Sequence, residues 1–128
     1  MGRYKDFLNG KHNTSDFCGI VVQTPDSDGI LSDFSHFFKK VDELGHGIVK
    51  IIGSDRLSLT ISKNAGKMNA DICFGSSQRF GVQMGFGGPH SGFFATTKSH
   101  VRKIPGRIIG ISKDIHENYA LRMALQTR

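Results

Sequence analysis

Two short apolar runs near the start of the chain are typical of buried strands. Residues 18–23 contain Ile20-Val21-Val22, and residues 47–53 carry two apolar pairs on either side of Lys50. Short β-branched runs bounded by glycine favour strands that lie inside a sheet. The stretch Thr24-Pro25-Asp26-Ser27-Asp28-Gly29 then predicts a turn, because proline presets φ, aspartate caps its own backbone and glycine accepts a positive φ.

The stretch between these runs predicts an amphipathic helix over residues 32–44. Ser32 is the expected N-cap and Gly45 the expected C-terminal stop. We interpret the apolar stripe as a surface buried against a sheet rather than a ligand-binding aromatic face. A strand, a helix and a strand in this order predict a βαβ unit with parallel strands. The stripe consists of Phe34, Phe37, Phe38, Val41 and Leu44.

Further strands are expected at residues 72–74, 92–96 and 108–111, so the predicted fold class is α/β with a mainly parallel sheet. Residues 97–103 can form one or two helical turns before Pro105, and residues 118–128 predict the opening of a helix. This sheet begins without a leading element, and the chain stops inside the predicted helix. We therefore expect a polar, irregular N-terminal segment over 1–16 and a partial domain over 17–128 that is truncated at both ends.

Composition narrows the class of protein. With 128 residues and 38% hydrophobic content the chain fits one soluble domain or part of one, and no stretch approaches the roughly 20 apolar residues that a membrane-spanning helix needs. The net charge of +6 permits a polyanion or nucleic-acid site. However, the basic residues form no long tract and no RNA-recognition signature, which favours a solvated basic surface and no nucleic-acid partner.

Cysteine and histidine give no sign of a metal site. Cys18 and Cys73 belong to no Cys-x-x-Cys pair, and we expect two buried, reduced thiols. The six histidines are scattered without the spacing of metal ligands. The sequence also contains no Gly-x-Ser-x-Gly elbow that would present a nucleophilic serine.

The most unusual segment is the glycine-rich stretch over residues 75–92. Its glycines argue against the interior of a helix or strand. They fit no standard nucleotide motif, because His90 stands where Gly-x-Gly-x-x-Gly needs glycine and no Gly-Lys-Ser/Thr follows. A tight structural loop and a phosphate-binding or interface role both stay open.

Several motifs, in order, resemble the N-terminal, non-PLP-binding half of glycine-decarboxylating P-proteins, the pyridoxal-phosphate (PLP) subunits of the glycine cleavage system. The resemblance covers roughly residues 17–128 and departs from the family at Asn69 for glycine, Gln83 for proline and Phe86 for tyrosine. The matching stretches are 23–29, Ala70-Asp71-Ile72, 75–82, 85–90, 105–110 and Ala124-Leu125-Gln126-Thr127-Arg128.

The resemblance implies a partial aminotransferase-like large domain of PLP fold type I. In that family the C-terminal half holds PLP through the lysine of a His-Lys-Thr-Phe motif, and Arg79 stands at the corresponding place here. Asp55 falls where the catalytic half places the aspartate that pairs with the pyridinium nitrogen, but without the lysine we favour its interpretation as a helix cap. We therefore expect no catalytic residue and no covalently bound PLP in this chain, and a loop with Gly87, Gly88 and His90 near the partner half's PLP.

The function implied is that of the complete P-protein, which decarboxylates glycine with PLP and transfers the aminomethyl group to the lipoyl arm of the H-protein. Expected partners are the C-terminal PLP-binding half, the lipoylated H-protein and a second copy in a homodimer. The expected location is the mitochondrial matrix, or bacterial cytoplasm for a prokaryotic source, with no membrane contact. Two other hypotheses are an independent PLP enzyme and a polyanion-binding α/β module.

Overall fold

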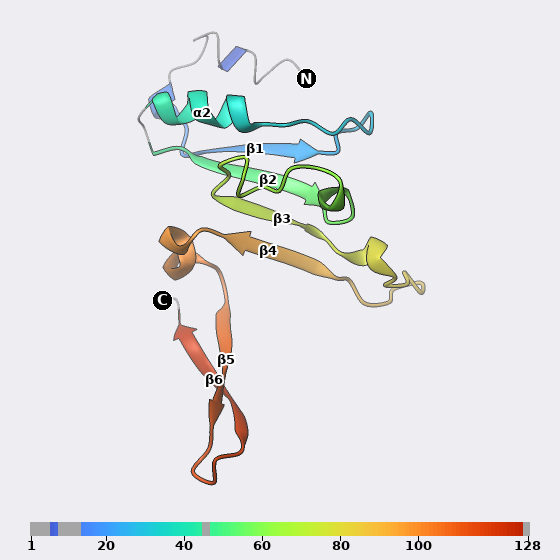
Figure 1. Ribbon diagram of the computed structural model, residues 1–128, viewed down its shortest axis with the longest axis vertical. Coiled ribbons are helices and arrows are strands. Elements are labelled where there is room, and N and C mark those ends of the chain that lie inside the picture. The colour runs from blue at the N-terminus through green and yellow to red at the C-terminus, as the bar shows by residue number, and fades with distance from the viewer. Residues whose placement is uncertain (1–5, 8–13, 45–46, 127–128) are drawn as a thin grey trace. The chain divides into compact units, whose positions relative to one another are not determined.

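The computed structural model describes residues 6–7, 14–44 and 47–126, and the chain forms two compact units that divide between Ala95 and Thr96. The first unit contains most of the regular structure (Figure 1). Its elements are the 3-10 turn η1 (Thr14–Asp16), β1 (Gly19–Thr24), α2 (Ser35–Glu43), β2 (Val49–Asp55), η2 (Ser58–Thr60), β3 (Ile72–Ser76), η3 (Gln78–Phe80) and β4 (Gly92–Thr96).

The sheet of the first unit has the order β1-β2-β3-β4. Strands β1 and β2 are parallel, with Val21 opposite Ile51, and β2 and β3 are parallel as well. The arrow of β4 points the opposite way from that of β2 (Figure 1). The predicted βαβ unit and the mainly parallel sheet are therefore confirmed.

Helix α2 buries the predicted stripe. Phe37, Phe38 and Val41 are buried, and Phe34 and Leu44 pack beside them. The helix begins at Ser35, so the expected N-cap at Ser32 is wrong. The N-cap is Phe34, which makes no side-chain capping bond, and just before it the Asp33 carboxylate accepts a 2.8 Å hydrogen bond from the Ser35 backbone N–H. The expected stop at Gly45 lies outside the described residues.

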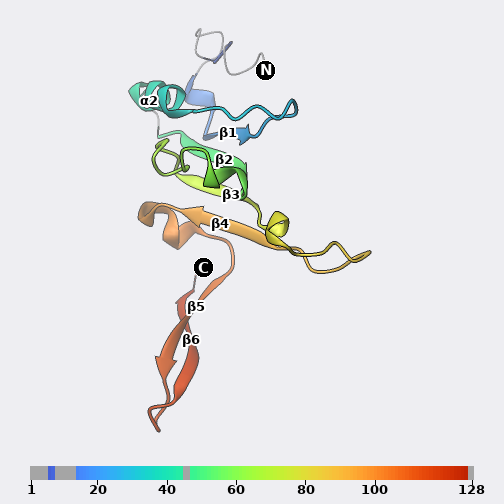
Figure 2. The same ribbon diagram turned by 45° about the vertical axis from the view of Figure 1, so that its right-hand side comes forward.

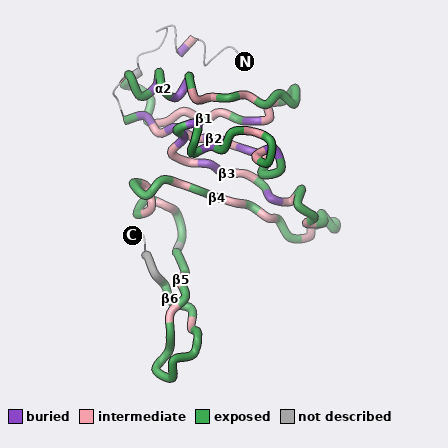
Figure 3. Tube along the Cα trace, in the orientation of Figure 1, coloured by how far each residue is buried: buried purple, intermediate pink, exposed green. Residues whose placement is uncertain are grey.

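The core lies between α2 and one face of the sheet, where the buried segments of Figure 3 gather. Phe38 and Ile52 are fully buried at its centre, and Met68 and Ala70 close it from the connection before β3. Phe7 also belongs to this core, and its ring meets that of Phe17 edge-on at 5.6 Å. The polar composition of residues 1–16 did not predict that Phe7 packs into the core.

The turn after β1 follows its predicted chemistry. One Asp26 carboxylate oxygen accepts hydrogen bonds from the backbone N–H groups of Asp28 and Ile30, at 3.0 and 2.9 Å. Gly29 has a φ of 79°, a conformation that glycine adopts without steric cost. Asp26 and Gly29 therefore form the turn that the sequence predicts at the end of β1.

The cysteine prediction is half right. Cys73 is buried, and burial raises the pKa of its thiol. Cys18 is exposed, because it lies just before β1 begins at Gly19 rather than within the strand. Strand β1 begins one residue later than the predicted run over 18–23.

The second unit contains the 3-10 helix η4 (Lys98–Lys103) and two antiparallel strands, β5 (Arg107–Lys113) and β6 (Tyr119–Gln126) (Figure 2). The expected helical turns over 97–103 and the strand over 108–111 are confirmed. The expected helix over 118–128 is wrong, because residues 119–126 pair with β5 as a strand. Within the described residues no helix is long and apolar enough to cross a membrane.

Candidate functional site at the carboxyl ends of the parallel strands

A hollow of about 400 Å³ lies in the first unit where β1, β2 and β3 end. In open α/β sheets, ligands bind outside the carboxyl ends of the strands, so this is the place where the fold favours a site. Both apolar and polar groups line the hollow. The residues that line it are Val21, Val22, Gln23, Thr24, Pro25, Gly53, Ser54, Asp55, Phe74, Gly75, Ser76 and Arg79.

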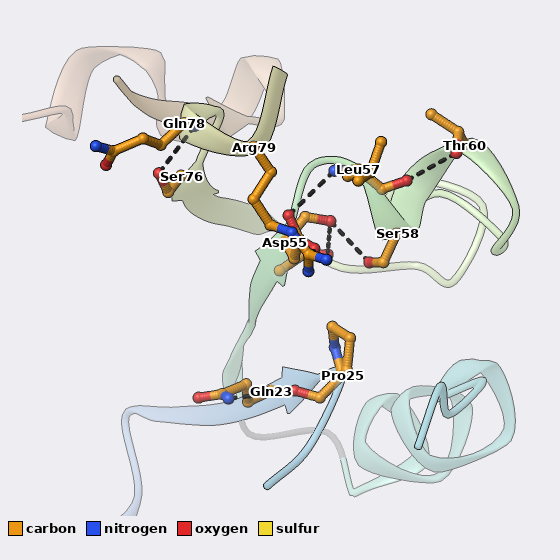
Figure 4. A network of polar contacts seen from close by, with 10 residues as sticks. Gln23, Pro25, Asp55, Leu57, Ser58, Thr60, Ser76, Gln78 and Arg79 are labelled. Atoms are coloured by element: carbon orange, nitrogen blue, oxygen red, sulfur yellow. Dashed lines mark hydrogen bonds and ion pairs between the residues drawn. The ribbon is translucent and has the colours of Figure 1, made fainter. Parts of the chain in front are cut away.

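An ion pair between Asp55 and Arg79 stands at this hollow (Figure 4). A guanidinium nitrogen of Arg79 lies 2.6 Å from a carboxylate oxygen of Asp55. The Asp55 side chain is 18% exposed and that of Arg79 is 67% exposed, so the carboxylate is sheltered while the guanidinium meets solvent. The two residues that sequence reasoning singled out as degenerate PLP-site positions are therefore in direct contact.

Asp55 also organises the chain that follows β2. Its second carboxylate oxygen accepts a 3.1 Å hydrogen bond from the Leu57 backbone N–H, and its backbone carbonyl accepts one of 2.7 Å from the Ser58 hydroxyl. These contacts start the short helix η2 (Figure 4). One carboxylate oxygen of Asp55 thus contacts the backbone that leads into η2 and the other contacts Arg79, while its pairing with a pyridinium nitrogen stays a prediction.

Arg79 is positioned by the short helix η3. The Ser76 hydroxyl accepts a 3.1 Å hydrogen bond from the Gln78 backbone N–H, and this contact fixes the first turn of η3. Gly81 ends the helix with a φ of 102° and donates its N–H to the Gln78 carbonyl, a left-handed stop typical of glycine. Because η3 follows β3 at once, the Arg79 side chain returns to the end of the neighbouring strand β2.

Covalent attachment of PLP needs an amine in this hollow, and the residues present do not provide one. The lining residues include arginine but no lysine, and a guanidinium stays protonated and forms no Schiff base. Lys50, on β2, is buried on the other side of that strand, where it pairs with Asp42 of α2 and lies 3.9 Å from Asp71. The hollow therefore does not fit a covalently held PLP.

The glycine-rich segment forms a strand end, a loop and a strand start. Gly75 lies inside β3, which corrects the expectation that these glycines avoid strand interiors. Beyond η3 the chain turns tightly: the Gly88 N–H donates a 2.7 Å hydrogen bond to the Met84 carbonyl, and φ is positive at Gly85, Phe86 and Gly87. The loop is tight, as predicted, and a phosphate-binding or interface role for it stays a prediction.

The loop and the hollow are separate features of the first unit. Gly87, Gly88 and His90 do not line the hollow, and Gly87 and His90 are exposed. Figure 1 shows the loop as the yellow excursion between β3 and β4. A role for these residues near a partner's PLP stays a prediction.

Metal binding finds no support in the described ranges, where no three histidine, cysteine, aspartate or glutamate side chains gather as a ligand set. Sequence reasoning missed the contribution of β1 and β3 to the hollow, above all Gln23 and Phe74. A signal was present, because parallel strands end at one edge of a sheet and the residues at their carboxyl ends meet there.

Comparison with known proteins decides the family. A family model described as "Glycine cleavage system P-protein" matches residues 4–128, a longer stretch than the resemblance over 17–128. The chain belongs to the P-protein family.

The family match also explains the backbone at Asn69, where the resemblance expects glycine. The φ of Asn69 is 67°, a left-handed conformation that asparagine tolerates better than most residues.

Curated P-protein relatives are much longer than this chain. It is 48% identical over 124 residues to the mitochondrial glycine dehydrogenase (decarboxylating) of Flaveria anomala, covering 97% of this chain and 12% of the relative. It is 46% identical over 129 residues to glycine dehydrogenase (decarboxylating) of Nostoc sp., covering 96% and 13%. The chain therefore spans about one eighth of the length of these relatives.

A solved P-protein structure has the same fold. The crystal structure of glycine decarboxylase (P-protein) of the glycine cleavage system, in inhibitor-bound form, matches with a TM-score of 0.76 and 38% identity. The match covers 89% of this chain and 26% of the crystallised one. It confirms the predicted α/β class as part of a P-protein domain.

Proposed function

We propose that this chain is a scaffold segment of the N-terminal, non-PLP-binding half of a P-protein and has no glycine decarboxylase activity by itself. The observation that carries the proposal is the Asp55–Arg79 ion pair at the hollow. A PLP site needs a free carboxylate for the pyridinium nitrogen and an amine for the aldehyde. In this chain the carboxylate already holds a guanidinium, and that guanidinium takes the place expected of the amine.

The chemistry belongs to the assembled enzyme. There, PLP in the C-terminal half supplies the electron sink for loss of carbon dioxide from glycine. Asp55 and Arg79 link the end of β2 to η3 in this chain, so their role is to hold the shape of a non-catalytic half. The names of the curated relatives, which are glycine dehydrogenases (decarboxylating), support this assignment.

The proposal includes three partners: the C-terminal PLP-binding half, the lipoylated H-protein that receives the aminomethyl group, and a second copy of the full-length enzyme in a homodimer. For a source with mitochondria the site of action is the matrix, a proposal that the names of the mitochondrial plant relatives support, and for a prokaryote it is the cytoplasm.

The isolated chain tests the proposal. Incubated with PLP and then borohydride, it is expected to give no adduct at any one specific lysine, and it should release no carbon dioxide from glycine. Mass mapping of the trapped protein makes the measurement, and scattered low-level labelling of exposed lysines is the background. Stoichiometric trapping at one lysine would favour the independent PLP enzyme instead.

A second prediction concerns the loop from Gly85 to His90, which we propose lies at the boundary with the catalytic half, close to its PLP phosphate. Runs of glycine let backbone N–H groups approach an anion without obstruction by side chains. At Gly88 an added Cβ would lie 2.8 Å from the Met84 carbonyl oxygen, so Gly88→Val should displace this loop.

The measurement uses a complete P-protein that carries Gly88→Val, with PLP affinity and thermal stability as the two readouts. We expect PLP affinity to fall by about tenfold or more, as for the loss of a positioned phosphate contact. Gly66→Val is the control, since its nearest neighbour to an added Cβ is a side-chain oxygen at 3.8 Å. A purely thermal defect would return the loop to a structural role.

A further inference from the structure

The β5–β6 hairpin has one apolar and one polar face. The register pairs Ile109 with Met123, Ile111 with Leu121 and Lys113 with Tyr119. Directly paired residues point to the same side, and successive residues alternate. The opposite side therefore carries Gly110, Ser112, Ala120 and Arg122. We call the apolar set Ile109, Ile111, Tyr119, Leu121 and Met123 the hairpin face, and Lys113 lies at its end beside Tyr119.

The hairpin face is open within the described part of the chain. Ile111 is 78% exposed, Leu121 79% and Tyr119 87%, and a shallow hollow of about 290 Å³ lies over these three residues and Ala120. Burying a large aliphatic or aromatic side chain stabilises a protein by about 1.5–3 kcal/mol, and a two-stranded hairpin alone is marginally stable in water. Such a face favours a permanent protein partner.

The charge of the chain is concentrated in the same unit. Residues 96–128 contain seven lysine and arginine residues against two acidic ones, a surplus of five, whereas residues 1–95 contain ten against nine, a surplus of one. A basic surplus in the unit that carries an exposed apolar face is complementary to an apolar surface with acidic side chains beside it. It also disfavours a second copy of this unit, because two such units repel each other.

We propose that the hairpin face docks on the portion of the P-protein polypeptide that lies outside these 128 residues, at an apolar surface rimmed by acidic side chains. The proposal rests on the proposed function. The relatives are about eight times longer than this chain, so the complete enzyme contains abundant surface for such a contact. Nucleic acid fits less well, because Tyr119 is the one residue of the hairpin face that can stack on a base, and its aliphatic side chains offer no such platform.

The test is affinity capture between this chain and the complementary remainder of the Nostoc enzyme, produced together as separate polypeptides. Ile111→Asp places a charge in the centre of the hairpin face, and Ser112→Asp makes the same charge change on the opposite side. We expect the first to weaken capture by more than about tenfold, since an unpaired charge would be buried, and the second to change it by less than about twofold. Raised salt should weaken wild-type capture.

Protection of the buried Cys73 thiol from alkylation reports that the first unit stays folded in each variant. Intact capture by Ile111→Asp, or equal loss in both variants with Cys73 protected, would overturn the docking surface and leave the proposed function standing. Self-association that Ile111→Asp abolishes, or co-purifying nucleic acid that it releases, would overturn it in favour of those occupants. A wild-type chain that captures nothing would count against the proposed function as well.

Discussion

Gly75→Ala is expected to destabilise the chain by about 3 kcal/mol or more, at the upper end of what overpacking costs. A Cβ at this position would lie 1.8 Å from the Ser54 carbonyl oxygen and 2.9 Å from its carbon. Neither atom can move away freely, because Ser54 belongs to β2, which pairs with β3 through Gly75 itself. The strands would have to separate at the point where the hollow is built.

Urea unfolding followed by circular dichroism makes the measurement. Gly92→Ala is the matched control in the neighbouring strand β4, since its added Cβ would meet nothing closer than the Gly75 carbonyl oxygen at 3.8 Å. The control should stay within about 1 kcal/mol of the wild type, as a glycine-to-alanine change does where there is space. An unchanged urea midpoint for Gly75→Ala would contradict the close approach of β2 and β3.

Phe38→Ala is expected to cost about 3–5 kcal/mol, as for other buried phenylalanines. Phe38 is fully buried, and its ring centroid lies 5.7 Å from that of Phe37 and 6.2 Å from that of Phe34. The substitution therefore leaves a cavity between α2 and the sheet.

The same unfolding measurement serves for this substitution. Phe86→Ala is its control, because Phe86 is fully exposed and exposed substitutions usually change stability by no more than about 0.5 kcal/mol. Equal unfolding midpoints for the two variants would show that α2 does not anchor the core.

The sequence predicted the first unit well because its local and long-range signals agree. The stripe with Phe37 and Phe38 has helical spacing, and the β-branched runs beside it need cover from such a helix. The helix begins later than the sequence predicts, although Ser32 and Asp33 are both good capping residues. The N-cap is Phe34, and the Asp33 side chain contacts Ser35 from the position before it.

The second unit shows why local propensity can mislead. Leucine, methionine, alanine, arginine and glutamine all favour helices, so residues 118–128 looked helical. Yet Tyr119, Leu121 and Met123 also alternate with Ala120 and Arg122, the period of a strand. Asp114 accepts backbone hydrogen bonds from His116 and Asn118, at 2.8 and 2.9 Å, and this turn brings β6 back along β5.

The sequence predicted the two residues of the candidate site but not the ion pair between them. Position by position, the resemblance pointed to Asp55 and Arg79, which lie 24 residues apart in the chain. Their ion pair depends on the parallel pairing of β2 with β3 and on the short helix η3. Neither spacing nor composition contains that information, because tertiary packing sets which strand ends are neighbours.

We propose that this chain is a scaffold segment and not the PLP-holding part of a P-protein. The most direct measurement replaces the matching segment of the Nostoc enzyme, 46% identical over 129 residues, with this chain. The chimera is then trapped with PLP and borohydride, and the modified lysine is mapped. We predict one adduct, at a lysine of the Nostoc sequence outside the replaced segment, together with carbon dioxide release from glycine. A specific adduct at a lysine within these 128 residues would contradict the account.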